Sequence, residues 1–140
     1  MDHFSVYTAA HPWLLLFTAV AASAVVFFES RWRVQSRASV VPQQAIRLVN
    51  DGATLVDLRD AGSFGEGHIA GAKNVPGDKI IAGADALKKL KDRPIIVYCE
   101  QGVSAAGTMR KLGQQGFSKV VNLRGGLSAW RAESLPVARD

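Results

Sequence analysis

The chain has 140 residues, a length that suits one compact domain with some chain left over. Hydrophobic residues make up 48% of it and charged residues 21%, a balance too apolar for a disordered chain and too charged for a protein with many membrane spans. With one cysteine and three widely separated histidines, a single copy has no intramolecular disulfide and no multi-cysteine metal site. The net charge of +5 comes without a long basic run, which disfavours nucleic acid as a partner.

The first part of the chain is strongly apolar. No Asp, Glu, Lys or Arg occurs between Asp2 and Glu29, and nearly every side chain from Trp13 to Phe28 is apolar. A helix rises ~1.5 Å per residue, so a hydrocarbon core of ~30 Å needs ~20 residues. We therefore predict a single transmembrane helix over residues 12–29.

The charges on either side of this helix predict its orientation. Arg31, Arg33 and Arg37 follow the span, whereas no Lys or Arg precedes it. Cytoplasmic flanks of membrane spans carry an excess of Lys and Arg. We therefore expect a short extracytoplasmic N-terminus over residues 1–11, a polar linker over 30–39, and the remaining chain on the cytoplasmic side of the cell membrane.

A cleaved signal peptide is the main alternative for this segment. Ala22-Ser23-Ala24 has the small residues of a cleavage site. A signal peptide opens with a basic region, however, and this chain opens with Met1-Asp2-His3. The buried helix of a soluble protein is a weaker alternative, because the segment has no amphipathic stripe.

Residues 40–140 predict one α/β domain. Runs rich in apolar and β-branched residues indicate strands, and apolar residues recurring every three or four positions indicate helices. Because strands alternate with helices, we expect a largely parallel sheet flanked by helices. The expected strands are 40–41, 54–58, 94–98 and 119–123. The expected helices are 42–50, 84–91, 104–115 and 128–133, and the glycine-rich stretch 62–76 is expected to be mostly irregular around a short turn.

Cys99 directly follows the most apolar of these strands, Pro94–Tyr98. In parallel α/β sheets, ligands bind beyond the carboxyl ends of the strands. Backbone N–H groups in a tight turn can converge on an anion, and the N-terminus of the following helix adds about half a positive charge. We therefore expect a fraction of Cys99 to be thiolate at neutral pH, with Gly102 allowing the turn a positive φ. From position alone, a small buried structural cysteine is an equal alternative.

Three motifs in residues 40–137 have the order and spacing of one known family. Val56-Asp57-Leu58-Arg59 and the stretch Gly67–Pro76 are similar to its D-x-R and G-H-I-x-G-A-x-N-[IV]-P segments. Val97–Gly102 is similar to its V-x-Y-C-x-x-G loop, and Leu123–Trp130 to its L-x-G-G-x-x-x-W segment. The chain therefore resembles a single rhodanese-like domain, which implies a three-layer α/β fold with a central, mostly parallel sheet.

The resemblance implies a sulfurtransferase. Cys99 would be the catalytic nucleophile, taking sulfane sulfur from thiosulfate or from a small-molecule or protein persulfide, and passing it to a thiol or to cyanide. The resemblance implies neither a metal nor a cofactor. The active-loop residues whose backbone amides would bind the substrate are Glu100, Gln101, Gly102, Val103 and Ser104.

Two features of the loop depart from the family's usual pattern. Many members carry Arg where this chain has Ser104, and others carry basic residues where Glu100 and Gln101 stand. Like charges a few ångströms apart repel by about 1 kcal/mol near a surface. We therefore expect poor use of dianionic thiosulfate unless Glu100 points away, and a persulfide as the better donor. Ser104 is expected either to cap the helix or to donate its hydroxyl to the sulfur.

Several other residues are expected to be structural. Asp57 and Arg59 should form an ion pair that fixes the loop as far as Gly67, and His68 should be a hydrogen-bonded turn residue. Trp130 is expected in the core. The remaining expectations are a close backbone approach at Gly125-Gly126 and a solvated basic helix face at Lys88, Lys89, Lys91 and Arg93.

Two other functions can be weighed against sulfur transfer. A phosphatase would need an Arg at the end of its anion-binding loop to clamp the phosphate, but the next Arg after Cys99 is Arg110, well inside the predicted helix. The stronger alternative is an interaction module, tethered at the membrane, that recruits a cytoplasmic or membrane-protein partner. In that case Cys99 is idle or acts as a redox sensor.

Overall fold

The structure is a computed structural model that describes residues 11–37, 39–82 and 85–140. The chain divides into two compact units, Met1–Arg37 and Ala38–Asp140. The expected N-terminal segment 1–11 lies, apart from residue 11, outside the described residues.

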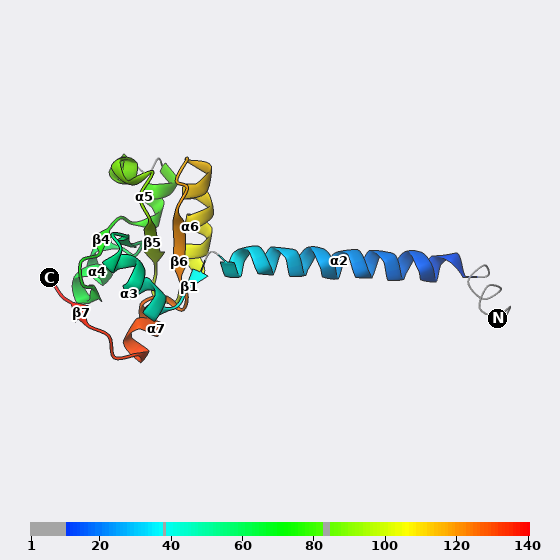
Figure 1. Cartoon of the computed structure of the whole chain (residues 1–140), viewed down its shortest axis with the longest axis horizontal. Coiled ribbons are helices and arrows are strands. Elements are labelled where there is room, and N and C mark those ends of the chain that lie inside the picture. Colours follow the sequence, from blue (N-terminus) through cyan, green and yellow to red (C-terminus); the bar gives the residue numbers. More distant parts are fainter. Residues whose placement is uncertain (1–10, 38, 83–84) are drawn as a thin grey trace. The chain divides into compact units, whose positions relative to one another are not determined.

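The described part of the first unit is one long helix, α2 (Pro12–Arg37; Figure 1). Its stretch Pro12–Ser30 is 19 residues long, unburied, and apolar enough to cross a membrane by length and composition. Within it, the Thr18 and Ser23 hydroxyls bond to carbonyls of the preceding turn, which satisfies them without a partner from outside the helix. The helix continues to Arg37, so most of the segment 30–39, expected as a linker, is helical. No Pro or Gly interrupts it there.

The second unit is built on a five-stranded parallel sheet with the order β1-β6-β5-β2-β4. The strands are β1 (Ser39–Val40), β2 (Thr54–Asp57), β4 (Lys73–Asn74), β5 (Ile95–Tyr98) and β6 (Val120–Leu123). The central strand β5 is buried along its whole length, which explains why its sequence is an uninterrupted apolar run. The parallel sheet predicted from the sequence is confirmed.

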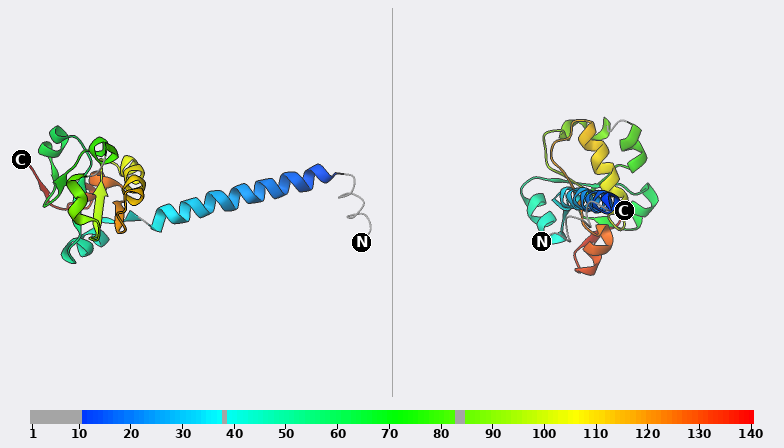
Figure 2. Two further views of the ribbon diagram at one scale, coloured as in Figure 1. Left: turned by 90° about the horizontal axis from the view of Figure 1, so that it is seen from above. Right: turned by 90° about the vertical axis from the view of Figure 1, so that its right-hand side faces the viewer.

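Helices cover both faces of the sheet. The helices of this unit are α3 (Pro42–Asn50), α4 (Ala61–Glu66), α5 (Gly77–Ala82), the 3-10 helix η1 (Asp85–Leu90), α6 (Val103–Gln114) and α7 (Gly126–Ala132), of which α4 lies against β3 rather than against this sheet. The ribbon views show helices on both sides of the sheet (Figures 1 and 2). One apolar cluster joins the sheet to α5, η1 and α6, and a second joins it to α3 and α7. Successive residues of β5 alternate between them, with Ile95 and Val97 in the first cluster and Ile96 and Tyr98 in the second.

The glycine-rich stretch 62–76 is more ordered than expected. It contains α4, the short strand β3 (His68–Ile69) and β4, and β3 pairs antiparallel with β7 (Val137–Ala138). Asp60 begins α4 because its side chain accepts a 2.9 Å hydrogen bond from the Ser63 amide. Strands of two residues are too short to produce an alternating pattern, so they leave no periodic signal in the sequence.

The boundaries of other helices also differ from expectation. The helix expected over 84–91 is a 3-10 helix from Asp85, and residue 84 lies outside the described part of the chain. Helix α5 was not expected. Helix α7 begins two residues earlier than expected, because Gly125 takes the left-handed conformation (φ 75°) at its N-cap.

Candidate active site

Cys99 lies at the carboxyl end of β5, in the turn that leads into α6. Only 7% of the residue is exposed, and it packs within the apolar cluster beneath α6. Its sulfur is nevertheless faced by a polar group, since the Gly102 amide donates a 3.0 Å hydrogen bond to Sγ. The burial of Cys99 agrees with the alternative of a small structural cysteine. The amide contact at its sulfur agrees with the alternative of a turn that binds an anion.

Several donors act on the Cys99 sulfur at once. Burial raises the pKa of Cys99, but hydrogen bonds from the Ser104 hydroxyl and from the backbone amides of Ala105, Gly102 and Gln101 outweigh burial, so that the pKa lies below its ordinary value. The site therefore favours a negative charge on sulfur. Of the expected donors, the Gly102 amide bonds directly to the sulfur, and the Gln101 amide lowers the pKa of Cys99 together with it. The Ala105 amide was missed, because only the curvature of the first turn of α6 brings it there.

Ser104 does not cap the helix. The N-cap of α6 is Gly102, in the left-handed conformation (φ 83°), and no side chain caps it. Ser104 lies inside the first turn instead, where its hydroxyl lowers the pKa of Cys99. Of the two roles expected for Ser104, helix capping is wrong, and donation to the sulfur stays a prediction. Val103, the first residue of α6, is 79% exposed.

The segment Gly125–Ser128 supports the Cys99 loop through its backbone. The amides of Leu127 and Ser128 donate 3.0 Å hydrogen bonds to the carbonyls of Cys99 and Glu100. A Cβ at Gly126 would collide with the Cys99 carbonyl oxygen and would lie 2.7 Å from the Gly102 amide nitrogen. The expected close backbone approach at Gly125-Gly126 is therefore confirmed, and it fixes the carbonyls so that the loop amides point inward.

Asp57 and Arg59 form the expected ion pair at the end of β2. Arg59 Nη2 lies 2.7 Å from Asp57 Oδ2, and Asp57 is fully buried. The same Nη2 donates a 2.6 Å hydrogen bond to the Gly67 carbonyl, which fixes the loop between them as predicted. The hydrogen bond with Asp57 raises the pKa of Arg59 above its ordinary value, so Arg59 stays protonated.

The Glu100 side chain is turned toward two guanidinium groups. Its Oε2 lies 3.0 Å from Arg59 Nη1, and its Oε1 lies 3.3 Å from Arg131 Nη1. Poor use of a dianionic donor was expected unless Glu100 points away, and its carboxylate is paired with these two guanidinium groups. Arg131 was not singled out from the sequence, because it lies 31 residues from Glu100 and reaches it only through the placement of α7.

The other residues singled out are structural, as expected. His68 is buried, with Nδ1 2.9 Å from the Phe64 carbonyl and its ring stacked on that of Phe64, although it lies in β3 rather than in a turn. Trp130 is buried and donates a 3.0 Å hydrogen bond from Nε1 to the Pro136 carbonyl. Within the described residues, His, Cys, Asp and Glu side chains form no group of three that could hold a metal ion.

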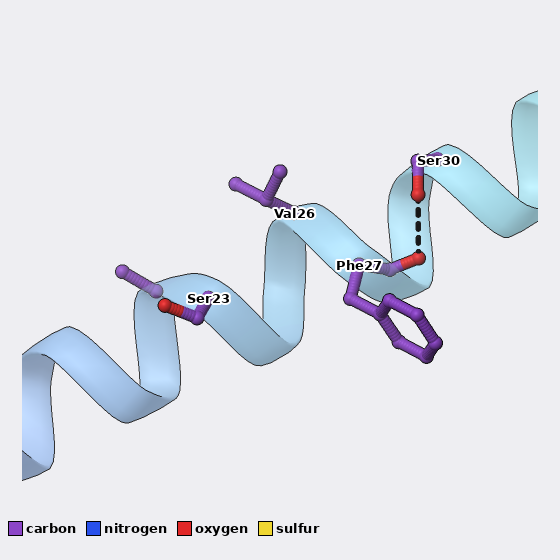
Figure 3. Close-up of a pocket in the computed structure, with 5 residues that line it drawn as sticks. Ser23, Val26, Phe27 and Ser30 are labelled. Carbon is purple, nitrogen blue, oxygen red and sulfur yellow. Dashed lines mark hydrogen bonds between the residues drawn. The ribbon is translucent and has the colours of Figure 1, made fainter.

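A shallow hollow occurs on α2 between Ala22, Ser23, Val26, Phe27 and Ser30 (Figure 3). All five residues belong to one helix, and none of them is titratable. The Ser23 and Ser30 hydroxyls bond to the carbonyls of Ala19 and Phe27, so both are already satisfied. The hollow therefore adds no reactive group to those of the Cys99 loop.

Comparisons with known proteins agree with this fold. The family model for the rhodanese-like domain matches residues 41–133. The uncharacterised protein YibN of Escherichia coli K12 is 32% identical over 146 residues, covering 99% of each chain, so that the match includes the N-terminal apolar segment. The thiosulfate sulfurtransferase GlpE of Stutzerimonas stutzeri is 40% identical over 95 residues, which cover 66% of this chain and 83% of GlpE.

Solved structures extend the likeness to the fold. A rhodanese-related protein of Thermoplasma volcanium superimposes with a TM-score of 0.66 and 24% identity, covering 73% of this chain and 98% of that protein. The family match spans the sheet from β2 to β6, the Cys99 loop and α7. This chain therefore belongs to the rhodanese-like domain family.

Proposed function

We propose that this protein is a membrane-anchored sulfurtransferase that carries sulfane sulfur as a persulfide on Cys99. The observation that supports it is the environment of the Cys99 sulfur, which accepts a 3.0 Å hydrogen bond from the Gly102 amide at the start of α6. Fixed main-chain donors of this kind stabilise an anion without a metal and without reorganising during the reaction. The sulfurtransferase GlpE relatives favour the same reaction class.

The first half of the reaction loads the sulfur. The Cys99 thiolate attacks the outer sulfur of thiosulfate, a bond forms between the two sulfurs, and sulfite leaves with the electron pair of the broken S–S bond. With a persulfide donor the leaving group is the donor's thiolate. Cys99 is left with a terminal anionic sulfur, and no proton has to be removed once the thiol is ionised.

The second half unloads it. An acceptor thiolate, or cyanide, attacks the terminal sulfur of the Cys99 persulfide. The acceptor becomes a persulfide, or thiocyanate, and the Cys99 thiolate is regenerated. The loop amides stabilise the anion in both halves of the reaction, because each half-reaction begins and ends with a negative charge on sulfur.

The charges around the loop favour a persulfide donor over thiosulfate. Glu100, Arg59, Arg131 and Asp57 form a connected group of two carboxylates and two guanidiniums, whose charges balance. A dianion therefore gains no net attraction from this group. We infer that a protein or low-molecular-weight persulfide is the better donor.

The apolar helix α2 supports membrane anchoring with the Cys99 domain in the cytoplasm. Its 19-residue stretch is long enough to span, and Arg31, Arg33 and Arg37 follow it. Sidedness can be tested with an exposed label site, Lys89→Cys, in a Cys99→Ser background. We expect a membrane-impermeant maleimide to label this variant in lysed cells and not in intact cells. Labelling in intact cells would place the domain outside.

The sulfur-transfer proposal itself is tested by turnover. The detergent-solubilised full chain is incubated with thiosulfate or with glutathione persulfide, and transfer to cyanide is followed as thiocyanate. We expect turnover with the persulfide to exceed that with thiosulfate, and none with Cys99→Ser. Equal rates for wild type and Cys99→Ser would reject the proposal and leave the tethered interaction module.

A further inference from the structure

Asn122 is a buried amide directly behind the Cys99 loop. It lies on β6, opposite Val97 of β5 on one side and Ser39 of β1 on the other, and is 5% exposed. Its Nδ2 donates a 3.0 Å hydrogen bond to the carbonyl of Gly102, a contact that is itself buried. A polar side chain thus stands in a sheet whose central strand β5 is apolar throughout, and its donor is directed at the loop.

The other half of this amide has no partner. Within the described residues, Asn122 Oδ1 is buried and makes no hydrogen bond. Turning the amide over would place this oxygen against the Gly102 carbonyl oxygen, so the observed orientation is the favourable one. An unpartnered buried oxygen lowers stability, and leucine, similar in size, would avoid it. The amide is therefore better explained by what its donor does at Gly102 than by packing.

Gly102 is the residue through which Asn122 reaches the sulfur. Its amide donates a hydrogen bond to the Cys99 sulfur, with 3.0 Å between N and Sγ, and its carbonyl oxygen accepts a hydrogen bond from Asn122 Nδ2. A residue with a side chain of its own could not replace Gly102, because its φ is 83° and a Cβ would lie 3.0 Å from the Leu123 carbonyl oxygen. The orientation of the peptide groups on both sides of Gly102 consequently depends on hydrogen bonds at its two ends.

We propose that Asn122 is a positioning residue that, by holding the Gly102 carbonyl, keeps the loop amides aimed at the sulfur of Cys99. It touches neither the sulfur nor a substrate. The proposal rests on Cys99 being the sulfur carrier of the proposed function. Its effect on the Cys99 thiolate can nevertheless be measured without sulfur transfer, because amides that no longer point at the sulfur stabilise the thiolate less.

The test is the pH dependence of Cys99 alkylation in the full chain. Cys99 is the only cysteine, so the rate of reaction with iodoacetamide reports on it alone. We expect Asn122→Leu to raise the midpoint of the profile by about half a pKa unit or more, which is about threefold in the ionisation constant. Asn122→Ala also removes the donor and should raise the midpoint as well. This variant tests the proposal if the leucine variant does not fold.

Gln115→Leu is the matched control. Gln115 also donates from its amide to a backbone carbonyl, that of Ile80 at 3.0 Å, and also has a buried unpartnered oxygen, but it lies at the opposite end of α6. We expect it to leave the midpoint unchanged. A midpoint unchanged in folded Asn122 variants, or an equal rise in Gln115→Leu, would overturn the proposal.

The two proposals can fail separately. A wild-type chain that takes no sulfur from any donor, together with raised midpoints in the Asn122 variants, would reject sulfur transfer and retain the positioning role. A wild-type chain that transfers sulfur, together with unchanged midpoints in those variants, would reject the positioning role alone.

Discussion

Arg59 donates a 3.0 Å hydrogen bond from Nη1 to Oε2 of Glu100, a residue 41 positions later in the chain. Through its other guanidinium nitrogens, Arg59 also holds the buried Asp57 and the Gly67 carbonyl. One side chain therefore ties the end of β2, the start of β3 and the Cys99 loop together. Because the three segments share this contact, the loop's shape depends on residues far from Cys99 in sequence.

Removing Arg59 should destabilise the fold strongly. Asp57 is fully buried, so Arg59→Met leaves it without its cationic partner, at a cost of about 3–5 kcal/mol. Arg131→Met removes the half-exposed partner of Glu100 and should cost about 1 kcal/mol or less. Chemical denaturation of the two variants measures the difference. Equal losses would mean that the pair at Asp57 contributes no more than a surface contact.

Neutralising Glu100 should improve the use of thiosulfate. Glu100→Gln leaves Arg131 uncompensated near the loop, and one added positive charge favours a dianion by about 1 kcal/mol, or about fivefold in KM. The control is Glu133→Gln, which removes an exposed carboxylate just after α7. Steady-state kinetics with thiosulfate would contradict this expectation if the KM of Glu100→Gln matched that of wild type or exceeded it.

Removing the Ser104 hydroxyl should raise the pKa of Cys99. Burial already raises it, and Ser104→Ala deletes the first of the hydrogen bonds that lower it again. The alkylation midpoint of wild type should lie below the ordinary pKa of a cysteine, and that of Ser104→Ala should move up toward it. A variant midpoint equal to that of wild type would show that the hydroxyl does not act on the sulfur.

The same shift predicts how stability depends on pH. The folded pKa of Cys99 lies below its unfolded value, so between the two the unfolded chain binds more protons. The contribution of Cys99 to the free energy of unfolding is therefore complete above the unfolded pKa and is lost as pH falls through the folded pKa. Comparing wild type with Cys99→Ser by denaturation across this interval isolates the contribution. A pH-independent difference would contradict it.

A methyl group at Gly126 should disrupt the loop. Gly126 has φ 58°, and a Cβ there would collide with the Cys99 carbonyl oxygen, so Gly126→Ala should lower both the stability and the reactivity of Cys99. Gly107→Ala is the control, because Gly107 lies inside α6 and a Cβ added there would meet no atom within 4 Å. That change should stabilise the helix by about 0.5–1 kcal/mol. If Gly126→Ala and Gly107→Ala had the same effect on stability and on Cys99 reactivity, the backbone at Gly126 would accommodate a side chain, contrary to this expectation.

The sheet and the position of Cys99 could be predicted because their signals are local. The apolar run Ile95–Tyr98 and the glycine in the following turn each lie within a few residues of Cys99. The ion pair of Asp57 and Arg59 was predictable for the same reason, since the two residues are two positions apart in the sequence. These features follow from strand burial and turn geometry, which one short segment can encode.

The rest of the site could not be predicted because it is assembled by tertiary contacts. Arg131 reaches Glu100 only after α7 has docked, and Asn122 meets Gly102 only through the alignment of β6 beside β5. Both side chains look like ordinary helix and strand residues in the sequence. Glu100 could therefore be identified from the sequence, but its two guanidinium partners could not.

The central claim is that Cys99 holds a persulfide, and intact-mass spectrometry tests it most directly. The full chain is treated with glutathione persulfide and separated from excess donor. Its intact mass is then measured before and after the addition of cyanide. We predict a gain of one sulfur atom that maps to Cys99 and is lost with cyanide, and no gain in Cys99→Ser. A wild-type mass unchanged by the donor, in a folded protein, would contradict the account.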